Sequence, residues 1–388
     1  MTTVVFVTVQ FEQTNSGPGT FADYIFRQYR NAPSVRLLVV TEDVENPNLY
    51  GGSVCKVHLP KSKILRTRPF RGRYYRDTIA KVESTLEGAI VWHNTSPLIS
   101  FYDLSRQPRR NPRVAMISDD NNVSARLWNH LASPRVTDGV KKWFLRHMER
   151  RALRQADSVV TNSRYLRETT SRAYGLDPDR VEVLYKGVDL SFFRFRDPRE
   201  VVMSSSPLKV LFAKRDYLRG GLSTVLAGLA RLDLPSVLTV AGPDTSHDET
   251  IERIARKTGF SGTLRMQGRL SKQELAQAYR ENDILCLLSE KEALGVVLLE
   301  AMSSGLPVIG TPVGGILEVL DHGRAGWLVS PGDASALAIT IENILNHVDQ
   351  RIDKVLAGRQ RSAQFSVDTM YRRFEAILIK VSDEFSTQ

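Results

Sequence analysis

The sequence predicts an α/β protein with two doubly wound parallel sheets, one in each half of the chain. Its 388 residues are too many for one ordinary hydrophobic core and suit two domains. In both halves, short apolar runs alternate with stretches of helix length, which is the pattern of parallel strands connected by helices. Residues 187–207 lack either periodicity and end in Ser and Pro, as a connection between domains would.

The predicted strands are short and apolar in both halves. In the first half they cover residues 3–9, 35–40, 89–92, 113–117 and 158–161. In the second half they cover residues 209–213, 236–241, 263–267, 284–288 and 307–310. We therefore expect domains at 1–190 and 191–365, with a terminal helix in 366–388 packing back on the first domain. Ligands of doubly wound sheets bind beyond the carboxyl ends of the strands, so a site is expected in the loops that follow them.

The net charge of +10 belongs to the first half of the chain. Residues 1–190 contain 29 Lys and Arg against 19 Asp and Glu, whereas residues 191–388 contain 24 of each. The basic residues are concentrated at 61–76, 106–113 and 141–154. The first half is therefore expected to meet an anionic partner, such as an anionic membrane surface. A nucleic acid is not expected, because the cations do not accompany a helix-turn-helix or an aromatic sheet motif.

The stretch 141–154 has helical spacing of apolar residues, with Arg and Lys on the other faces. The apolar stripe consists of Val140, Trp143, Phe144, His147, Met148 and Ala152. Such a helix either packs its stripe on its own domain or lies on a membrane surface. There is no apolar run near 18 residues and no signal peptide pattern. We therefore expect a cytoplasmic protein, with a peripheral place on the inner face of the membrane as the alternative for its basic half.

The strongest chemical signal is the segment 288–311, LSEKEALGVVLLEAMSSGLPVIGT. A predicted strand ends there, a loop carries Glu292, and a helix follows with Glu300 two turns inside it. Three amides lie at the predicted start of this helix, those of Gly295, Val296 and Val297. Amides at a helix N-terminus and the helix dipole attract a phosphate.

This segment resembles the signature of the retaining glycosyltransferases of family four, E-x-F-G-x-x-x-x-E-A-x-x-x-G-x-P-V. Here Leu294 replaces the usual Phe. The resemblance implies a GT-B fold of two Rossmann-like domains facing a cleft, with the nucleotide-sugar domain second. It also implies that Glu292 acts on the donor sugar as a catalytic residue and that Leu294 and the amides of 295–297 bind the donor. Glu300 would bind the ribose, because a carboxylate accepts two hydrogen bonds from a vicinal diol.

A pair of cations follows the first predicted strand of the second half. The segment Leu211-Phe-Ala-Lys214-Arg-Asp-Tyr-Leu-Arg219-Gly220-Gly221 resembles the family's Gly-Arg and Lys-Gly pair, with Lys and Arg exchanged. The resemblance implies that Lys214 and Arg219 hold the donor diphosphate, with Arg215 as a substitute for Lys214. Fixed cations stabilise the charge of the departing nucleoside diphosphate. Shorter matches extend the resemblance over residues 157–340.

The first half resembles the family more weakly, as an acceptor-binding domain would. Gly17 and Gly19 precede a helix predicted to begin near Phe21, where the family's Gly-Gly approaches the donor; a simple turn is the alternative. Ser118 occupies the place of a family His that faces the sugar. We expect neighbouring polar residues to take over: Asp119 as a catalytic residue, with Asp120 as its alternative, and Asn121 and His93 as acceptor contacts. A structural role is the alternative for His93.

The resulting hypothesis is a retaining, metal-independent glycosyltransferase of the hexosyltransferase type. It would use a nucleoside diphosphate sugar, most simply a UDP-sugar, and a glycan or lipid-linked acceptor, with no cofactor. The paired Asp119 and Asp120 do not suggest a metal, because no third ligand is near in sequence. A related-fold sugar-nucleotide epimerase or phosphorylase and a catalytically degenerate nucleotide-sugar-binding protein are the alternatives.

Overall fold

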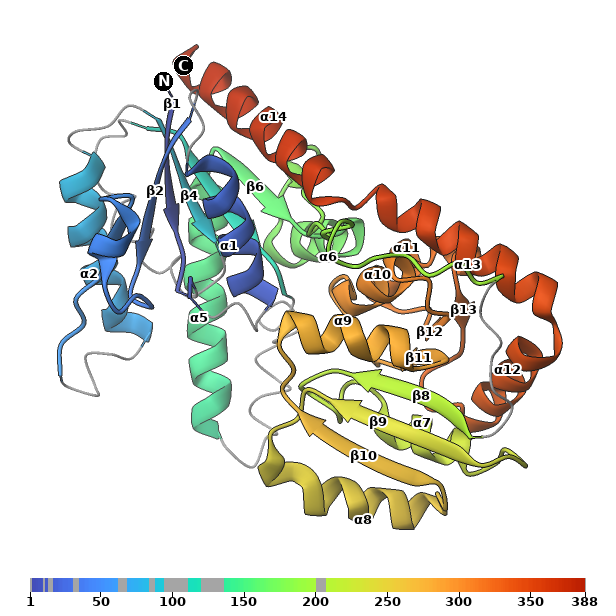
Figure 1. Ribbon diagram of the computed structural model, residues 1–388. Coiled ribbons are helices and arrows are strands. Elements are labelled where there is room, and N and C mark those ends of the chain that lie inside the picture. The colour runs from blue at the N-terminus through green and yellow to red at the C-terminus, as the bar shows by residue number, and fades with distance from the viewer. Residues whose placement is uncertain are drawn as a thin grey trace. The chain divides into compact units, whose positions relative to one another are not determined.

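The computed structural model describes residues 2–9, 11–12, 17–30, 35–61, 68–83, 88–93, 111–119, 136–199 and 207–387. The chain divides into two compact units. Unit 1 is Met1–Tyr185 with Met370–Gln388, and unit 2 is Lys186–Thr369. Figure 1 shows both units as sheets covered by helices. The chain leaves unit 1 after Tyr185, slightly before the boundary expected at residue 190.

Unit 1 contains a seven-stranded sheet in the order β3-β2-β1-β4-β5-β6-β7, and each pairing is parallel. Its strands are β1 (Thr2–Val7), β2 (Val35–Thr41), β3 (Val54–Lys56), β4 (Gly88–His93), β5 (Arg113–Ile117), β6 (Ser158–Thr161) and β7 (Val181–Val183). Its helices include α1 (Gly17–Tyr29), α2 (Arg68–Glu83), α5 (Val136–Gln155), α6 (Arg164–Tyr174) and most of α14 (Val367–Ser386). The strand order reverses between β1 and β4, which is where doubly wound sheets open a crevice.

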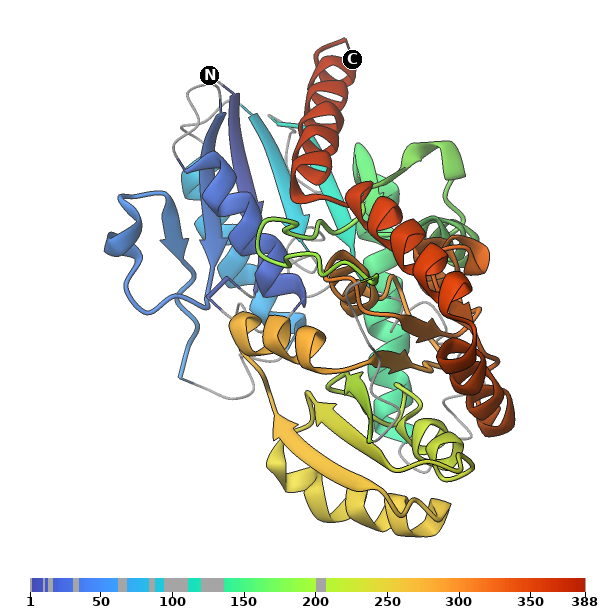
Figure 2. The same ribbon diagram turned by 45° about the vertical axis from the view of Figure 1, so that its right-hand side comes forward.

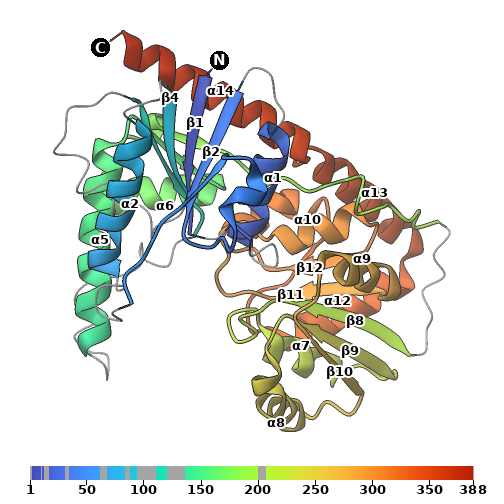
Figure 3. The ribbon, with the colours of Figure 1, turned by 60° about the vertical axis from the view of Figure 1, so that its left-hand side comes forward.

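Alternate side chains of these strands face helices on opposite sides of the sheet, as the period of two requires. On one face, Trp92 belongs to a buried cluster with Tyr75 of α2 and Leu153 of α5. On the other face, Phe6 meets Phe21 of α1, with ring centroids 6.2 Å apart. Figure 3 shows α2 and α5 on one side of the strands and α1 on the other. Both faces are thus covered, which explains why the strands read as continuous apolar runs.

Unit 2 contains a six-stranded parallel sheet in the order β10-β9-β8-β11-β12-β13. Its strands are β8 (Leu208–Ala213), β9 (Ser236–Ala241), β10 (Thr263–Gly268), β11 (Ile284–Leu287), β12 (Val308–Gly310) and β13 (Trp327–Leu328). Its helices include α7 (Leu222–Leu229), α8 (Asp248–Thr258), α9 (Lys272–Glu281), α10 (Val296–Ser303), α11 (Gly314–Val319), α12 (Ala334–Asn346) and α13 (Val348–Ala363). Figures 1 and 2 show α8 and α9 on opposite faces of this sheet.

The core of unit 2 is built in the same way. Phe212 of β8 and Leu238 of β9 pack with Val225 of α7 and Ile341 of α12 in one buried cluster. Tyr279 of α9 is buried on the opposite face. The two α/β sheets confirm the fold class that the sequence predicts, and the expected strands differ from those observed by at most two residues at an end. The sequence misses β3, β7 and β13, because two or three residues are too few to show a period.

The first helix corrects one expectation. Helix α1 begins at Gly17, whereas the sequence predicts a start near Phe21. Pro18 suits a first helical turn, because its fixed φ is helical and its missing N–H needs no partner there. Gly17 and Gly19 therefore lie in the first turn of α1 and not in a loop that precedes it.

Helix α5 turns its described apolar side chains toward unit 1. Met148, Ala152 and Leu153 are buried, whereas His147, expected on the same stripe, is exposed. The side chains of Val140, Trp143 and Phe144 lie outside the described part. Over its described half, the stripe therefore packs on its own domain, and this is the first of the two alternatives. Among the described residues, no helix is long and apolar enough to cross a membrane.

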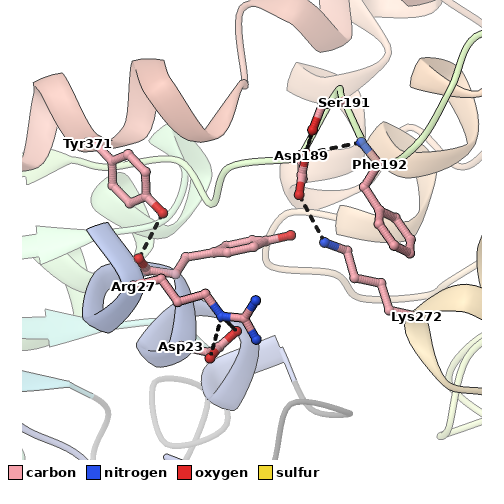
Figure 4. Close-up of polar contacts among 8 residues, drawn as sticks. Asp23, Arg27, Asp189, Ser191, Phe192, Lys272 and Tyr371 are labelled. Atoms are coloured by element: carbon pink, nitrogen blue, oxygen red, sulfur yellow. Dashed lines mark hydrogen bonds and ion pairs between the residues drawn. The ribbon is translucent and has the colours of Figure 1, made fainter. Parts of the chain in front are cut away.

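Helix α14 completes unit 1 at the end of the chain. The Tyr371 hydroxyl donates to the backbone oxygen of Tyr24, with 2.7 Å between the oxygens (Figure 4). Glu182 in β7 accepts from Arg373 at 2.5 Å and from Lys380 at 2.7 Å. Ile377, Leu378 and other apolar residues of α14 are buried. The last helix is therefore an integral layer of the first unit.

A matched pair of isoleucines in α14 tests this packing. Ile377 is 2% exposed and Ile379 is 62% exposed. We expect Ile377→Ala to lower the free energy of unfolding by about 2–5 kcal/mol, because it removes buried methyl groups and leaves a cavity. Ile379→Ala should change it by less than about 0.5 kcal/mol. Chemical denaturation measures both, and equal effects would show that α14 does not pack as described.

Candidate functional site

The carboxyl edge of the unit 2 sheet brings together two of the residues singled out in the sequence. Lys214 directly follows β8, and Glu292 lies in the loop after β11. The Lys214 Nζ donates to Glu292 Oε2 at 2.5 Å and to Ser289 Oγ at 3.1 Å. The two charged side chains are 19% and 21% exposed. The pair is therefore partly shielded from water, where Coulomb attraction exceeds that of a surface ion pair.

The loops that carry this pair touch through their backbones, and glycines permit the contact. A Cβ on Gly221 would lie 2.1 Å from the carbonyl oxygen of Leu288, and one on Gly315 would lie 2.3 Å from that of Ala293. The Gly315 amide donates to the carbonyl oxygen of Glu292 at 3.0 Å. A side chain at either glycine would push the loops after β8, β11 and β12 apart. These close approaches place Lys214 and Glu292 within reach of each other.

Helix α10 begins next to this loop. Gly295 precedes its first residue with φ 89°, in the left-handed region that favours glycine. Val296 and Val297, whose amides the sequence singled out, form the first turn and are half-buried. Leu294 is buried, 2% exposed, so its side chain belongs to the core. The helix N-terminus offers amides that have no acceptor within the helix, which suits an anion.

Glu300 lies further along α10 and pairs with a tyrosine. The Tyr279 hydroxyl donates to Glu300 Oε2 at 2.8 Å. Burial raises the pKa of Glu300 to about 7, against the lowering effects of the Tyr279 hydrogen bond and the Lys272 charge. A carboxyl group with this pKa changes charge near neutral pH. It is mostly neutral below pH 7 and mostly ionised above it.

Arg219 does not share the Lys214–Glu292 pair. Its guanidinium is 61% exposed, and its Nε lies 3.5 Å from Asp216 Oδ2. Its backbone oxygen accepts from the amide of Glu290 at 3.2 Å, so the loop itself is tied to the loop after β11. Arg215, the expected substitute for Lys214, is also exposed. Of the expected cations, Lys214 is the one that the structure brings to Glu292.

The described candidate residues of unit 1 include His93 at the end of β4 and Asp119 just after β5, its parallel neighbour in the sheet. His93 is fully buried, its ring centroid 5.3 Å from that of Phe6 and 4.9 Å from that of Phe21. This burial favours the structural alternative for His93 over direct contact with an acceptor. Asp119 is half-buried after β5. Asp120 and Asn121 lie outside the described residues.

The sequence analysis does not predict two residues that form hydrogen bonds with the candidate residues. Ser289 stands beside Lys214, and Tyr279 stands beside Glu300. Ser289 follows directly after a predicted strand, which is a signal that could have found it. Tyr279 lies on the buried face of a helix and looks like an ordinary core residue in the sequence. In the described part of the chain, no group of three or more His, Cys, Asp or Glu is arranged to hold a metal.

The close approach of the loops predicts different effects for two glycines with the same backbone conformation. Gly221 has φ 76° and meets Leu288, whereas Gly259 has φ 77° and nothing within 4 Å of a built Cβ. Gly259→Ala should cost about 1–2 kcal/mol of stability, the penalty of the left-handed region. Gly221→Ala should cost clearly more, because the backbone must also move. Denaturation experiments on both variants measure the difference, and equal losses would contradict the close contact.

Two family models match the chain in succession. A model described as Glycosyltransferase Family 4 matches residues 34–192, and one described as Glycosyl transferases group 1 matches residues 194–361. Among curated relatives, a glycogen synthase of Mycobacterium tuberculosis is 27% identical over 277 residues, which are 70% of this chain and 62% of the relative. The match therefore spans less than two thirds of that relative's length.

Solved structures with the same fold cover the chain more completely. A sucrose-phosphate synthase from Thermosynechococcus elongatus matches with a TM-score of 0.76 and 18% identity, over 100% of both chains. HepE from Anabaena, solved in complex with UDP-glucose, matches with a TM-score of 0.70 and 18% identity, also over 100% of both. These likenesses show the fold. These structures have the GT-B fold, and so does this chain. The two family models together span nearly all of residues 34–361 and establish that the chain belongs to the family-four, group 1 glycosyltransferases.

Proposed function

We propose that this protein transfers a sugar from a nucleoside diphosphate sugar to an acceptor hydroxyl group. The observation that carries the proposal is the Lys214–Glu292 pair at the carboxyl edge of a doubly wound sheet, close to the N-terminus of α10. A cation, a carboxylate and helix amides are the groups that a diphosphate and a sugar need. The same fold in HepE, which was solved with UDP-glucose, supports a UDP-sugar as the donor.

In this proposal, donor binding exchanges the partners of the Lys214–Glu292 pair. The diphosphate takes Lys214, together with Arg219 and the amides of residues 295–297. Glu292 is then free to accept hydrogen bonds from hydroxyl groups of the donor sugar. Because both side chains are only partly exposed, the exchange replaces one buried charge contact with another and leaves neither charge without a partner.

The chemical step is proposed to retain the configuration at the anomeric carbon and to need no metal. The acceptor oxygen bonds to the anomeric carbon on the face from which the diphosphate leaves. The bond from that carbon to the phosphate oxygen breaks, and the acceptor proton passes to the departing phosphate. Lys214 and the α10 amides stabilise the charge that develops on this leaving group. Asp119 and Asn121 remain the proposed contacts to sugar and acceptor.

The acceptor is proposed to bind unit 1 and to be a glycan that is anionic or linked to a lipid. A cavity of about 460 Å³ lies at the carboxyl ends of β1–β3, with polar and charged residues in its wall. Glu42 accepts there from Arg71 Nε and from the Tyr75 hydroxyl, each at 3.1 Å. Lys56 and His58 also line the cavity. Fixed polar groups next to apolar lining residues suit a sugar.

A thermal-shift screen of UDP, GDP, ADP and their sugars tests the donor site. One of them, present at about 100 times its dissociation constant, should add about 2.7 kcal/mol of stability. Lys214→Met should abolish this gain, whereas Lys209→Met, an exposed lysine at the other end of β8, should keep it. No gain with any nucleotide would contradict the donor site.

The stabilising sugar nucleotide then serves to test transfer, with lipid extracts and soluble glycans as acceptors. Glu292→Ala should slow the acceptor-dependent release of nucleoside diphosphate at least about 100-fold, as expected when a group that contacts the reacting sugar is lost. Glu290→Ala, an exposed carboxylate in the same loop, should leave the release unchanged. Near-normal turnover in Glu292→Ala would remove that residue from the mechanism.

We propose that this protein binds an anionic membrane surface through exposed basic residues of unit 1. Arg150 and Arg151 of α5 are exposed, while the described apolar side chains of this helix face the core. We expect flotation with anionic vesicles at low salt and release at high salt, because each cation near the surface contributes about 1 kcal/mol. Arg150→Gln with Arg151→Gln should weaken binding about 30-fold, because two such cations are lost. Arg253→Gln with Lys257→Gln on α8 is the matched control, and no flotation of the wild type would exclude the membrane.

A further inference from the structure

The Glu300 carboxyl is held by a residue that lies on another helix. Tyr279 belongs to α9 and is 2% exposed, and its hydroxyl donates to Glu300 Oε2 at 2.8 Å. Burial, with the nearby Glu300 charge, raises the pKa of Tyr279 well above its ordinary value. The phenol therefore stays protonated and remains a donor at every pH of interest. One lone pair of Glu300 Oε2 is thereby occupied, and the plane of the carboxyl group is constrained.

A cation on the same helix is also held in place. Lys272, in the first turn of α9, places its Nζ 3.2 Å from Asp189 Oδ2 and 4.2 Å from the ring centre of Phe192. Asp189 accepts in addition from the Ser191 hydroxyl at 2.7 Å and from the Phe192 amide at 3.1 Å (Figure 4). These contacts restrict a long side chain that would otherwise be mobile. The positive charge of Lys272 lowers the pKa of the Glu300 carboxyl group.

The ring of Phe193 lies near both Tyr279 and Lys272. The Phe193 ring lies 5.8 Å from that of Tyr279, and Lys272 Nζ lies 5.7 Å from the Phe193 ring centre. The described elements that pack on α10 also include β11, β12, α11 and α13. In the described part of the chain, the titratable groups that act on the Glu300 carboxyl are Tyr279 and Lys272, both from α9. Asp189 pairs with Lys272.

We propose that Tyr279 is a positioning residue for the donor, which orients the Glu300 carboxyl group to accept a ribose diol, and that the charge of Lys272 favours the ionised form of that group. The inference rests on the proposed role of Glu300 in donor binding. A neutral carboxyl group keeps one proton and loses acceptor capacity, so it receives a diol less well than a carboxylate does. The phenol donor and the ammonium charge both favour the carboxylate. Burial opposes them, and the balance lies near neutral pH.

The test is the affinity for a nucleoside diphosphate, measured by calorimetry at pH 6 and pH 9 with the whole chain of 388 residues. The probe is UDP, GDP or ADP, whichever stabilises the wild type in the thermal screen. Tyr279→Phe removes the hydroxyl and keeps the ring. Without this donor the pKa of Glu300 rises further, so a smaller fraction of the carboxyl is ionised at pH 6. A rise of about one unit would lower affinity about tenfold at pH 6 and hardly at pH 9.

The chain offers a matched control in unit 1. Tyr174 is also buried, and its hydroxyl donates to Glu149 Oε2 in the same kind of phenol–carboxylate contact. Tyr174→Phe should lower thermal stability much as Tyr279→Phe does, but should leave nucleotide affinity unchanged at both pH values. Because the ligand is the same for all variants, its own ionisation cancels in the comparison.

Lys272 provides a second test that does not depend on a buried substitution. Lys272→Gln should weaken binding in the same pH-dependent way, by about threefold at pH 6, because a nearby positive charge is lost. Lys272→Arg keeps the charge and should restore affinity toward that of the wild type. A loss that is equal at pH 6 and pH 9, in Tyr279→Phe and Lys272→Gln alike, would mean a merely structural role and would overturn the inference.

The outcomes also separate this inference from the proposed function. If Glu300→Ala abolishes binding while Tyr279→Phe and Lys272→Gln bind as the wild type does at pH 6, the donor site stands and the positioning role fails. If no nucleoside diphosphate binds the wild type, both fail. If the affinity of the wild type does not fall between pH 9 and pH 6 more than that of Glu300→Gln, Glu300 does not titrate in the site, and the positioning role fails.

Discussion

The candidate site depends on the contact between the loops that follow β8 and β11. Lys214 and Glu292 are 78 residues apart in the chain and form an ion pair because Gly221 and Gly315 let the backbones of neighbouring loops meet. A parallel sheet brings the carboxyl ends of its strands to one edge. Glycine has no side chain, so Gly221 and Gly315 allow the loops to come close together. Without this close approach, the lysine and the glutamate would be two separate surface charges.

The two glutamates of the candidate site, Glu292 and Glu300, have different partners. Lys214 and Glu292 neutralise each other, whereas Glu300 has a phenol as its direct partner and a lysine acting on it. A partly buried carboxyl group without a directly bonded cation is costly to ionise, which is why its pKa lies near neutrality. Functional sites often retain such groups, because a ligand can supply the missing hydrogen bonds. With its pKa raised to about 7, Glu300 changes its charge near neutral pH.

The two units differ in what they present to the surroundings. Unit 2 carries the balanced half of the sequence and the groups suited to a nucleotide. Unit 1 carries the basic excess, with exposed arginines on α5 and a polar cavity at the ends of β1–β3. Function lies in such sites and not in the fold, which the family shares widely.

The sequence by itself determined the fold class, every observed strand of more than three residues, and Lys214, Glu292 and Glu300 as candidate residues. Buried parallel strands leave continuous apolar runs, and helix starts leave glycines, so both are readable locally. Only the tertiary structure decided that α1 begins at Gly17, that His93 lies against aromatic rings, and that Tyr279 and Ser289 contact candidate residues. These features depend on contacts between side chains of elements that are distant in the chain. A local sequence pattern carries no information about such contacts.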